Sequence, residues 1–354
     1  MSEAMKRAIR IGLAVLLTLP AAGAAWADPA TDAYNTGVRL LEADKASEAI
    51  PYFDRAIRLD PRYAVAYNNR GVAYRKLGRN DRAIQDFTEA IHLNPHAEDA
   101  YIGRGNAYDD LGQPQHAIED YTEAIRLNPR AERAYHNRGI THQKLGQLER
   151  AIEDYTEAIR LNPRYANSYL NRGVAYAKLG QHQRALQDFT EAIRLNPRDA
   201  DAYYNRGRTH YDLGQHQRAL HDYDQVLRLD PNVTEVFFHR GKALFMLSQF
   251  DRAIRDFTQA IDLSPRYDEA YRFRGVTRTV KGDPAGAITD LDKTIEINSK
   301  NARAYGDRDI ARLLLWKDVE AQRDFAKCYE LDSSLRQSFE SLIEKAKVKR
   351  AGKP

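Results

Sequence analysis

Arginine and aspartate recur together along this 354-residue chain, at a spacing that suggests ion pairing. An arginine stands sixteen residues before an aspartate, and this arrangement returns every 34 residues in eight copies. A guanidinium can hold a carboxylate through two parallel hydrogen bonds. The eight pairs are Arg70 with Asp86, Arg104 with Asp120, Arg138 with Asp154, Arg172 with Asp188, Arg206 with Asp222, Arg240 with Asp256, Arg274 with Asp290 and Arg308 with Asp324.

One period before the first pair, the chain has Thr36 and Tyr52, so both members are absent together. Joint presence and joint absence predict a structural pair that bridges two neighbouring elements. The alternative is a stripe of arginines that binds RNA or another phosphate, but each arginine would already have a counterion. The net charge of +4 is also far from the basic footprint of a nucleic-acid-binding protein. We therefore expect no nucleic-acid partner.

The other reactive residues form no motif for catalysis or metal binding. The sequence has no P-loop, no GxSxG and no HExxH, and its ten histidines show no metal-binding spacing with cysteine. His142 and His210 stand at a position of the repeat where an aromatic side chain packs. Cys328 replaces a repeat alanine and is expected to be a small buried thiol. We expect no enzyme activity, catalytic residue, cofactor or metal.

These side chains must be positioned by a unit of 34 residues that recurs nine times without insertion. Apolar residues in each half of the unit fall at steps of three, four and seven, as Tyr67 and Tyr74 do, which predicts helices and not strands. A glycine such as Gly78 ends the first helix, and Asn-Pro or Asp-Pro ends the second. Each unit is thus a helix pair, A then B. Residues 28–335 hold the nine units, which begin at Ala30, Ala64, Glu98, Glu132, Ala166, Ala200, Thr234, Asp268 and Ala302.

The unit resembles the tetratricopeptide repeat in its length, its two helices, glycine at position 8, alanine at position 20 and proline at position 32. The resemblance covers about 306 of the 354 residues. Glycine costs a helix about 1 kcal/mol relative to alanine, so its presence in eight units indicates helices that approach closely there. The resemblance implies an all-α fold, a right-handed α-solenoid of nine helix pairs, with helices A on the concave face and helices B on the convex face.

In the family, positions 2, 5, 6, 9, 12 and 13 of helix A face the concave groove. Position 6 is asparagine in five repeats, similar to the asparagine ladder of the superhelical domain of O-GlcNAc transferase, where amides hold a peptide backbone. The alternative is that asparagine is simply common at this position in the family. The asparagines are Asn35, Asn69, Asn137, Asn171 and Asn205.

From the sixth repeat onward the expected groove turns aromatic and apolar. An exposed apolar patch of that size usually marks a contact surface. The alternative is that the superhelix, a second copy or the C-terminal helix buries these side chains. The candidate binding residues on this patch are Tyr204, Tyr211, Phe238, Phe245, Met246 and Phe273, which Leu313 and Leu314 continue.

The C-terminal segment, residues 336–354, predicts a capping helix followed by a basic tail. The tail is expected to be unstructured and solvated, with contact to anionic lipid or a polyanion as the alternative. The cap is indicated by one apolar stripe, made of Leu335, Phe339, Leu342, Ile343 and Ala346, and the tail holds Lys347, Lys349, Arg350 and Lys353.

The N-terminal segment, residues 1–27, has the features of a signal peptide. A basic front precedes a short apolar run, and Ala25-Trp26-Ala27 offers cleavage before Asp28. The run is shorter than the roughly 20 residues of a membrane span, so an uncleaved anchor is the weaker alternative. We expect a periplasmic protein whose mature chain is not inserted in a membrane.

Taken together, these features predict a secreted scaffold that binds a protein or peptide segment in its concave groove. The alternative is a structural component of a cell-envelope assembly or export complex, held by its convex face and tail. The partner, the process and the oligomeric state are left open by the sequence.

Overall fold

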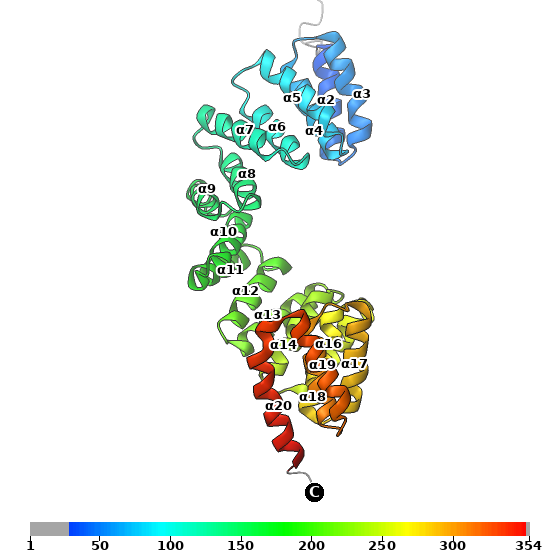
Figure 1. Cartoon of the computed structure of the whole chain (residues 1–354). Coiled ribbons are helices and arrows are strands. Elements are labelled where there is room, and N and C mark those ends of the chain that lie inside the picture. The colour runs from blue at the N-terminus through cyan, green and yellow to red at the C-terminus, as the bar shows by residue number, and fades with distance from the viewer. Residues whose placement is uncertain (1–27, 352–354) are drawn as a thin grey trace, which may run out of the picture. The chain divides into compact units, whose positions relative to one another are not determined.

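The computed structural model describes residues 28–351, and all regular structure in this range is helical. Two kinds of helix alternate along the chain (Figure 1). Helices A are α2 (Pro29–Glu42), α4 (Ala64–Lys76), α6 (Glu98–Asp110), α8 (Glu132–Lys144), α10 (Ala166–Lys178), α12 (Ala200–Asp212), α14 (Thr234–Met246), α16 (Asp268–Lys281) and α18 (Ala302–Leu313). Helices B are α3 (Ala46–Leu59), α5 (Asn80–Leu93), α7 (Pro114–Leu127), α9 (Leu148–Leu161), α11 (His182–Leu195), α13 (His216–Leu229), α15 (Phe250–Leu263), α17 (Pro284–Ile297) and α19 (Asp318–Leu331).

Helices A begin where the sequence places the start of each repeat, except that α2 begins one residue earlier, at Pro29. Proline suits this position because its fixed φ is already helical and the first turn needs no N–H donor. Asp28 caps the helix by accepting a hydrogen bond from the Ala30 amide at 3.3 Å. The expected signal peptide lies outside the described residues.

The chain divides into two compact units, unit 1 (residues 1–141) and unit 2 (residues 142–354), and the division falls within α8. Away from α8, each helix A packs on helix B of its own repeat, and each helix B packs on helix A of the next repeat. Successive helices A also touch, for example α12 with α14 and α14 with α16. This is the helix-pair order of a tetratricopeptide solenoid, as expected.

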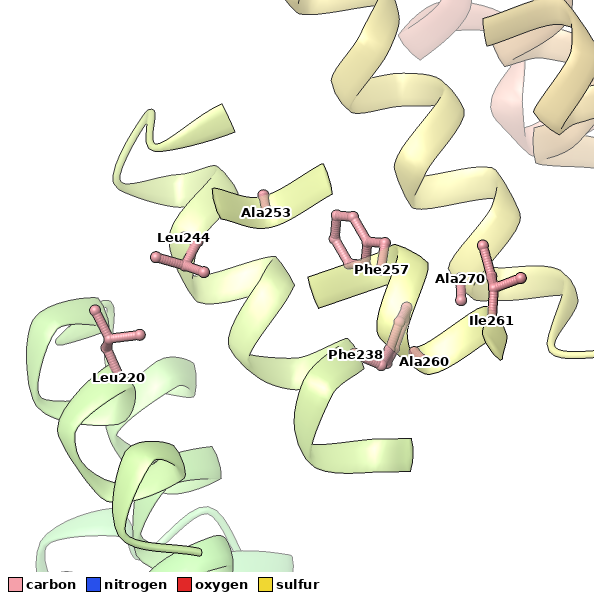
Figure 2. Packing of buried hydrophobic residues seen from close by; sticks show 8 residues of the cluster. All are labelled: Leu220, Phe238, Leu244, Ala253, Phe257, Ala260, Ile261 and Ala270. Atoms are coloured by element: carbon pink, nitrogen blue, oxygen red, sulfur yellow. The ribbon is translucent and has the colours of Figure 1, made fainter. Parts of the chain in front are cut away.

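Small residues bring helices A and B of one repeat together. The alanine at position 20 is fully buried in all nine repeats. A Cβ added to Gly241 would lie 2.7 Å from Cε1 of Phe257, so a side chain there would collide with the ring. Figure 2 shows Phe257 in this core between α14 and α15, beside Phe238 and Ala260. Glycine at position 8 therefore makes room for the large residue at position 24 of helix B.

The left-handed turn between helices A and B explains the second recurrent glycine of the unit. Gly180 and Gly214 have φ values of 72° and 71°, a region that glycine enters without steric cost. Three repeats have another residue in the same conformation, namely Asp44, Ser248 and Trp316.

A 3-10 turn, η1 (Ser333–Leu335), leads into a last helix, α20 (Arg336–Ala351), which packs on α18. In Figure 1 it is the red helix beside α18 and α19. Three residues of the expected apolar stripe, Leu335, Phe339 and Ala346, are buried, but Leu342 is 43% exposed and does not belong to the contact.

The expectation of an unstructured basic tail is wrong for residues 347–351, because the helix continues to Ala351. The guanidinium of Arg350 lies 4.1 Å above the Trp316 ring and bonds to Asp318 at 2.8 Å, which fixes the end of the helix on the ninth repeat. Lys353 lies outside the described residues. Over residues 28–351, no helix has the length and apolar character to cross a membrane.

Candidate functional site

The arginine–aspartate pairs form as the sequence predicts. Seven of the eight have both members in one unit, and in each the arginine Nε and Nη2 donate to the two carboxylate oxygens at 2.6–3.0 Å. Arg138 and Asp154 lie in different units, so their pairing remains a prediction. The seven pairs are Arg70 with Asp86, Arg104 with Asp120, Arg172 with Asp188, Arg206 with Asp222, Arg240 with Asp256, Arg274 with Asp290 and Arg308 with Asp324.

The same arginines also reach the preceding repeat, which the sequence reasoning missed. Nη1 of Arg172 donates to Thr156 at 3.0 Å, and Nη1 of Arg70 donates to Asp54 at 2.6 Å. The signal was present in the sequence, because a threonine or aspartate stands sixteen residues before each of these arginines. Burial lowers the pKa of Arg70, but its bonds to Asp86 and Asp54 outweigh burial and raise that pKa overall. These arginines therefore join neighbouring repeats through bonds to counterions and hydroxyl groups.

Three of the five asparagines at position 6 use their amides within the chain. Asn69 Nδ2 donates to the Tyr34 hydroxyl of the preceding repeat at 2.8 Å. Asn137 Nδ2 donates to Asn106 at 2.8 Å, and Asn205 Nδ2 donates to the backbone carbonyl of its own helix, at Asp201. Asn171 is half-buried on α10. An amide keeps a second N–H and its oxygen lone pairs when one N–H is used, so a role in peptide binding stays a prediction.

Phe238 corrects one expectation about the aromatic patch. Phe238 was expected to be exposed, but only 6% of its surface is accessible to solvent. Its ring lies 5.0 Å from Tyr267 and 6.0 Å from Phe257 of the same repeat, and 5.4 Å from Phe273 of the next repeat, so rings from both repeats cover it. Phe238 is therefore part of the core in Figure 2 and is not an exposed residue of the patch. Leu313, 5% exposed, is buried as well.

The other patch residues are partly accessible. Tyr204, Tyr211, Phe245 and Phe273 are half-buried, because each packs on a neighbouring ring while keeping part of its surface open. Met246 is the most open, at 52% exposed. We call this surface of α12, α14 and α16 the A-helix face; it consists of Tyr204, Tyr211, Lys242, Phe245, Met246, Phe273 and Val280.

Lys242 lies at the centre of the A-helix face, and the sequence reasoning did not single it out. Its Nζ is 5.0 Å from the ring centre of Tyr211, 5.6 Å from that of Phe238 and 5.5 Å from that of Phe273. These rings come from three consecutive repeats. Burial lowers the pKa of Lys242, while the charges of Asp212 and Glu269 partly restore it. Within the described residues, neither carboxylate forms a hydrogen bond with the ammonium, so its donors remain available.

A second charged group on α16 is satisfied internally. Arg272 is 8% exposed and bonds to Asp307 of α18 at 2.8 Å and to Glu269 at 3.2 Å. Its guanidinium also lies 4.5 Å above the Phe273 ring. Burial raises the pKa of Asp307, and the attraction of Arg272 opposes that rise. This network fastens the eighth repeat to the ninth.

Two further polar groups lie beneath the A-helix face. His239 contacts Tyr204 and Phe238, and burial lowers its pKa to about 4, so the imidazole is neutral at pH 7. The hydroxyl of Tyr223 is buried and has no hydrogen-bond partner among the residues that the structure describes. Neither His239 nor Tyr223 is arranged as an activated nucleophile or a general base. Residues 28–351 also contain no group of three His, Cys, Asp or Glu residues able to hold a metal ion.

Models of tetratricopeptide repeats match the chain over most of its repeats. A model described as "TPR repeat" matches residues 143–180, and models described as "Tetratricopeptide repeat" match residues 64–97, 98–130, 120–153, 170–234 and 238–302. The chain belongs to the tetratricopeptide repeat family. This TPR protein has the architecture of a protein-interaction scaffold, and members of the family are in general scaffolds without enzyme activity. No significant match was found among curated proteins.

Solved structures are similar to the chain, and those with TM-scores above 0.5 share its fold. A tetratricopeptide repeat protein from Parabacteroides merdae is 23% identical, with 70% of this chain and 98% of that chain covered and a TM-score of 0.53. Pseudomonas aeruginosa pilF is 20% identical, with coverages of 60% and 96% and a TM-score of 0.55. YrrB, described as a TPR protein with an unusual peptide-binding site, is 28% identical, with coverages of 53% and 96% and a TM-score of 0.48.

Proposed function

We propose that this TPR protein is a secreted, periplasmic scaffold that binds an extended segment of a partner protein along its A-helix face. The observation that carries the proposal is the combination on α14 of an accessible apolar side chain with a lysine that has no ion-pair partner within residues 28–351. Met246 stands four residues after Lys242, so both lie on one side of the helix. The periplasmic location rests on the signal-peptide features of residues 1–27.

The chemistry of this face suits a segment with both apolar and acceptor groups. Met246 is 52% and Val280 is 45% exposed, and covering them would remove apolar surface from water at a gain of about 25 cal/mol per Å². A flexible thioether adapts to ligands of different shape. The ammonium of Lys242 can donate to a backbone carbonyl or a carboxylate, and the surrounding rings limit competition from water.

A peptide-display experiment tests the proposal even though the partner is unidentified. Random twelve-residue peptides on phage are selected on the full chain, and the selected peptides are titrated against variants. We expect Met246→Ser with Val280→Ser, and separately Lys242→Met, to weaken binding at least tenfold. Leu229→Ser is the matched control, because Leu229 is 38% exposed at the end of a helix B. If the control weakens binding as much as the double variant, the A-helix face is not the site.

A component of an envelope assembly, held by its convex face and C-terminal end, is the second candidate. One observation favours it: Trp316 and Val319 are 65% and 61% exposed beside the fixed end of α20. If this interpretation holds, Trp316→Ser should release the protein from the envelope fraction, whereas the Met246 and Val280 double variant should remain there.

A further inference from the structure

Asp309 is an exception within the repeat. Position 8 is glycine in the other eight repeats, where it leaves room for the large residue of helix B. In the ninth repeat Asp309 occupies this place and is only 2% exposed. Its Oδ2 is buried and, in the described part of the chain, has no hydrogen-bond partner. A buried carboxylate without a partner is unfavourable, whereas the protonated form is much less so.

The side chain at position 24 is also less buried in the ninth repeat than in the others. The residue at position 24 is at most 1% exposed in the first eight repeats, as with Phe257 and Leu291. Phe325, its counterpart beside Asp309, is only partly buried and is pressed against Tyr329, with ring centres 3.8 Å apart. The ninth repeat thus has a buried carboxyl group at the position where the other repeats have glycine, which places a titratable group in its A–B contact.

Arg312 and Lys347, whose charges act on Asp309, and its chain neighbour Arg308 are bonded to other carboxylates. Arg308 and Arg312 both bond to Asp324, at 2.6 Å, and Lys347 of α20 bonds to Glu344 at 2.8 Å. Burial and the charge of Asp324 raise the pKa of Asp309 to about 7, against weaker attraction from Lys347 and Arg312. The charged or titratable groups that face it are Arg312 on α18, Asp324, Cys328 and Tyr329 on α19, and Lys347 on α20.

We propose that Asp309 makes the ninth repeat and its capping helix α20 a proton-sensitive latch, closed more tightly in acid than at neutral pH. The latch covers α18, where Phe339 lies against Gly306. When the repeat opens, Asp309 meets water and its pKa falls toward 3.8. Above pH 7 both states are ionised, and stability is constant. Between about pH 7 and pH 4 the closed state keeps a proton that the open state loses, so closure strengthens as the pH falls.

The size of the effect follows from the two pKa values. A difference of about three units changes the closing equilibrium by about 1,000-fold, or up to tenfold per pH unit between pH 4 and pH 7. The ninth repeat and α20 contain no histidine, so no imidazole in this part of the chain titrates in the same range. Cys328 does not interfere either, because burial raises its pKa to about 11.

Hydrogen exchange of the full chain, followed by mass spectrometry between pH 5 and pH 8, tests the latch. After correction for the intrinsic exchange rate, protection of peptides from α18, α19 and α20 should fall about tenfold per unit from pH 5 to pH 7 and then level off. Asp309→Asn keeps the shape without the charge, and Asp309→Gly restores the repeat glycine. Both variants should abolish the dependence, and if the amide prevents folding of the repeat, the glycine variant decides.

Two results would overturn the latch. Protection in the parent chain that does not change with pH would mean that Asp309 is not protonated in the closed state. A dependence that persists in both variants would place the titrating group elsewhere. Peptides from α2 and α3, far along the chain, serve as the internal reference.

Discussion

Removing the carboxylate of Asp188 tests whether the arginine–aspartate pairs stabilise the solenoid. Arg172 and Asp188 join α10 to α11 through two hydrogen bonds of 2.8 Å, and their side chains are 16% and 8% exposed. In Asp188→Ala, Nε and Nη2 of Arg172 lose their acceptors, and Nη1 keeps only Thr156. Breaking a buried pair by removing one partner costs about 3–5 kcal/mol, because the other charge stays buried. We expect a loss of stability of this size.

The same helix provides a matched control. Glu191, three residues after Asp188, bonds to Arg194 at 2.6 Å, but these side chains are 33% and 65% exposed. Water can replace the lost contact at such a site, so Glu191→Ala should leave the unfolding free energy unchanged within experimental scatter. Distance alone would not distinguish the two pairs; burial does.

Urea unfolding and hydrogen exchange of α10 and α11 measure the two variants, since a repeat protein can open locally. The double variant Arg172→Leu with Asp188→Leu leaves no unpaired charge and should be more stable than Asp188→Ala. If Asp188→Ala is no more destabilising than Glu191→Ala, or if the double variant is less stable than the single one, the pair is effectively solvated and the reasoning fails.

Two further predictions concern groups beneath the A-helix face. Tyr223→Phe should raise stability by up to about 1 kcal/mol, because the buried Tyr223 hydroxyl has no hydrogen-bond partner within residues 28–351. Tyr121→Phe should lower stability by a similar amount, because the Tyr121 hydroxyl donates to Asn106 at 2.8 Å. Equal effects of the two variants in thermal melts would contradict this prediction. Burial lowers the pKa of His239 from 6.5 to about 4, so as the pH falls the unfolded chain binds a proton at this residue at a higher pH than the folded chain does. His239 therefore contributes stability above pH 6.5, and up to about 3 kcal/mol of it is lost as the pH falls toward 4. His239→Phe should flatten the unfolding free energy over this range, and an unchanged slope would show that the imidazole is already solvated.

Much of the fold could be predicted from the sequence because the residues that shape one helix pair recur in every repeat. Glycine at position 8, alanine at position 20 and glycine at the turn act within one helix pair, and nine copies make that pattern visible. The arginine–aspartate pairs were also predictable, since the first repeat lacks both members. Even the additional bond of Arg172 to Thr156 had a signal, a fixed separation of sixteen residues.

The candidate site depended on contacts between repeats, which the pattern within one repeat does not contain. Phe238 and Met246 lie on the same helix A, yet Tyr267 at the end of their own repeat and Phe273 of the next repeat cover Phe238, whereas Met246 stays open. The surroundings of Lys242 come from α12, α14 and α16 together. Side-chain spacing places a residue on a face of its own helix, but its exposure is set by the size of whatever the neighbouring helix presents there. Which residue lies next to a given side chain is decided by the packing of helices in the tertiary structure.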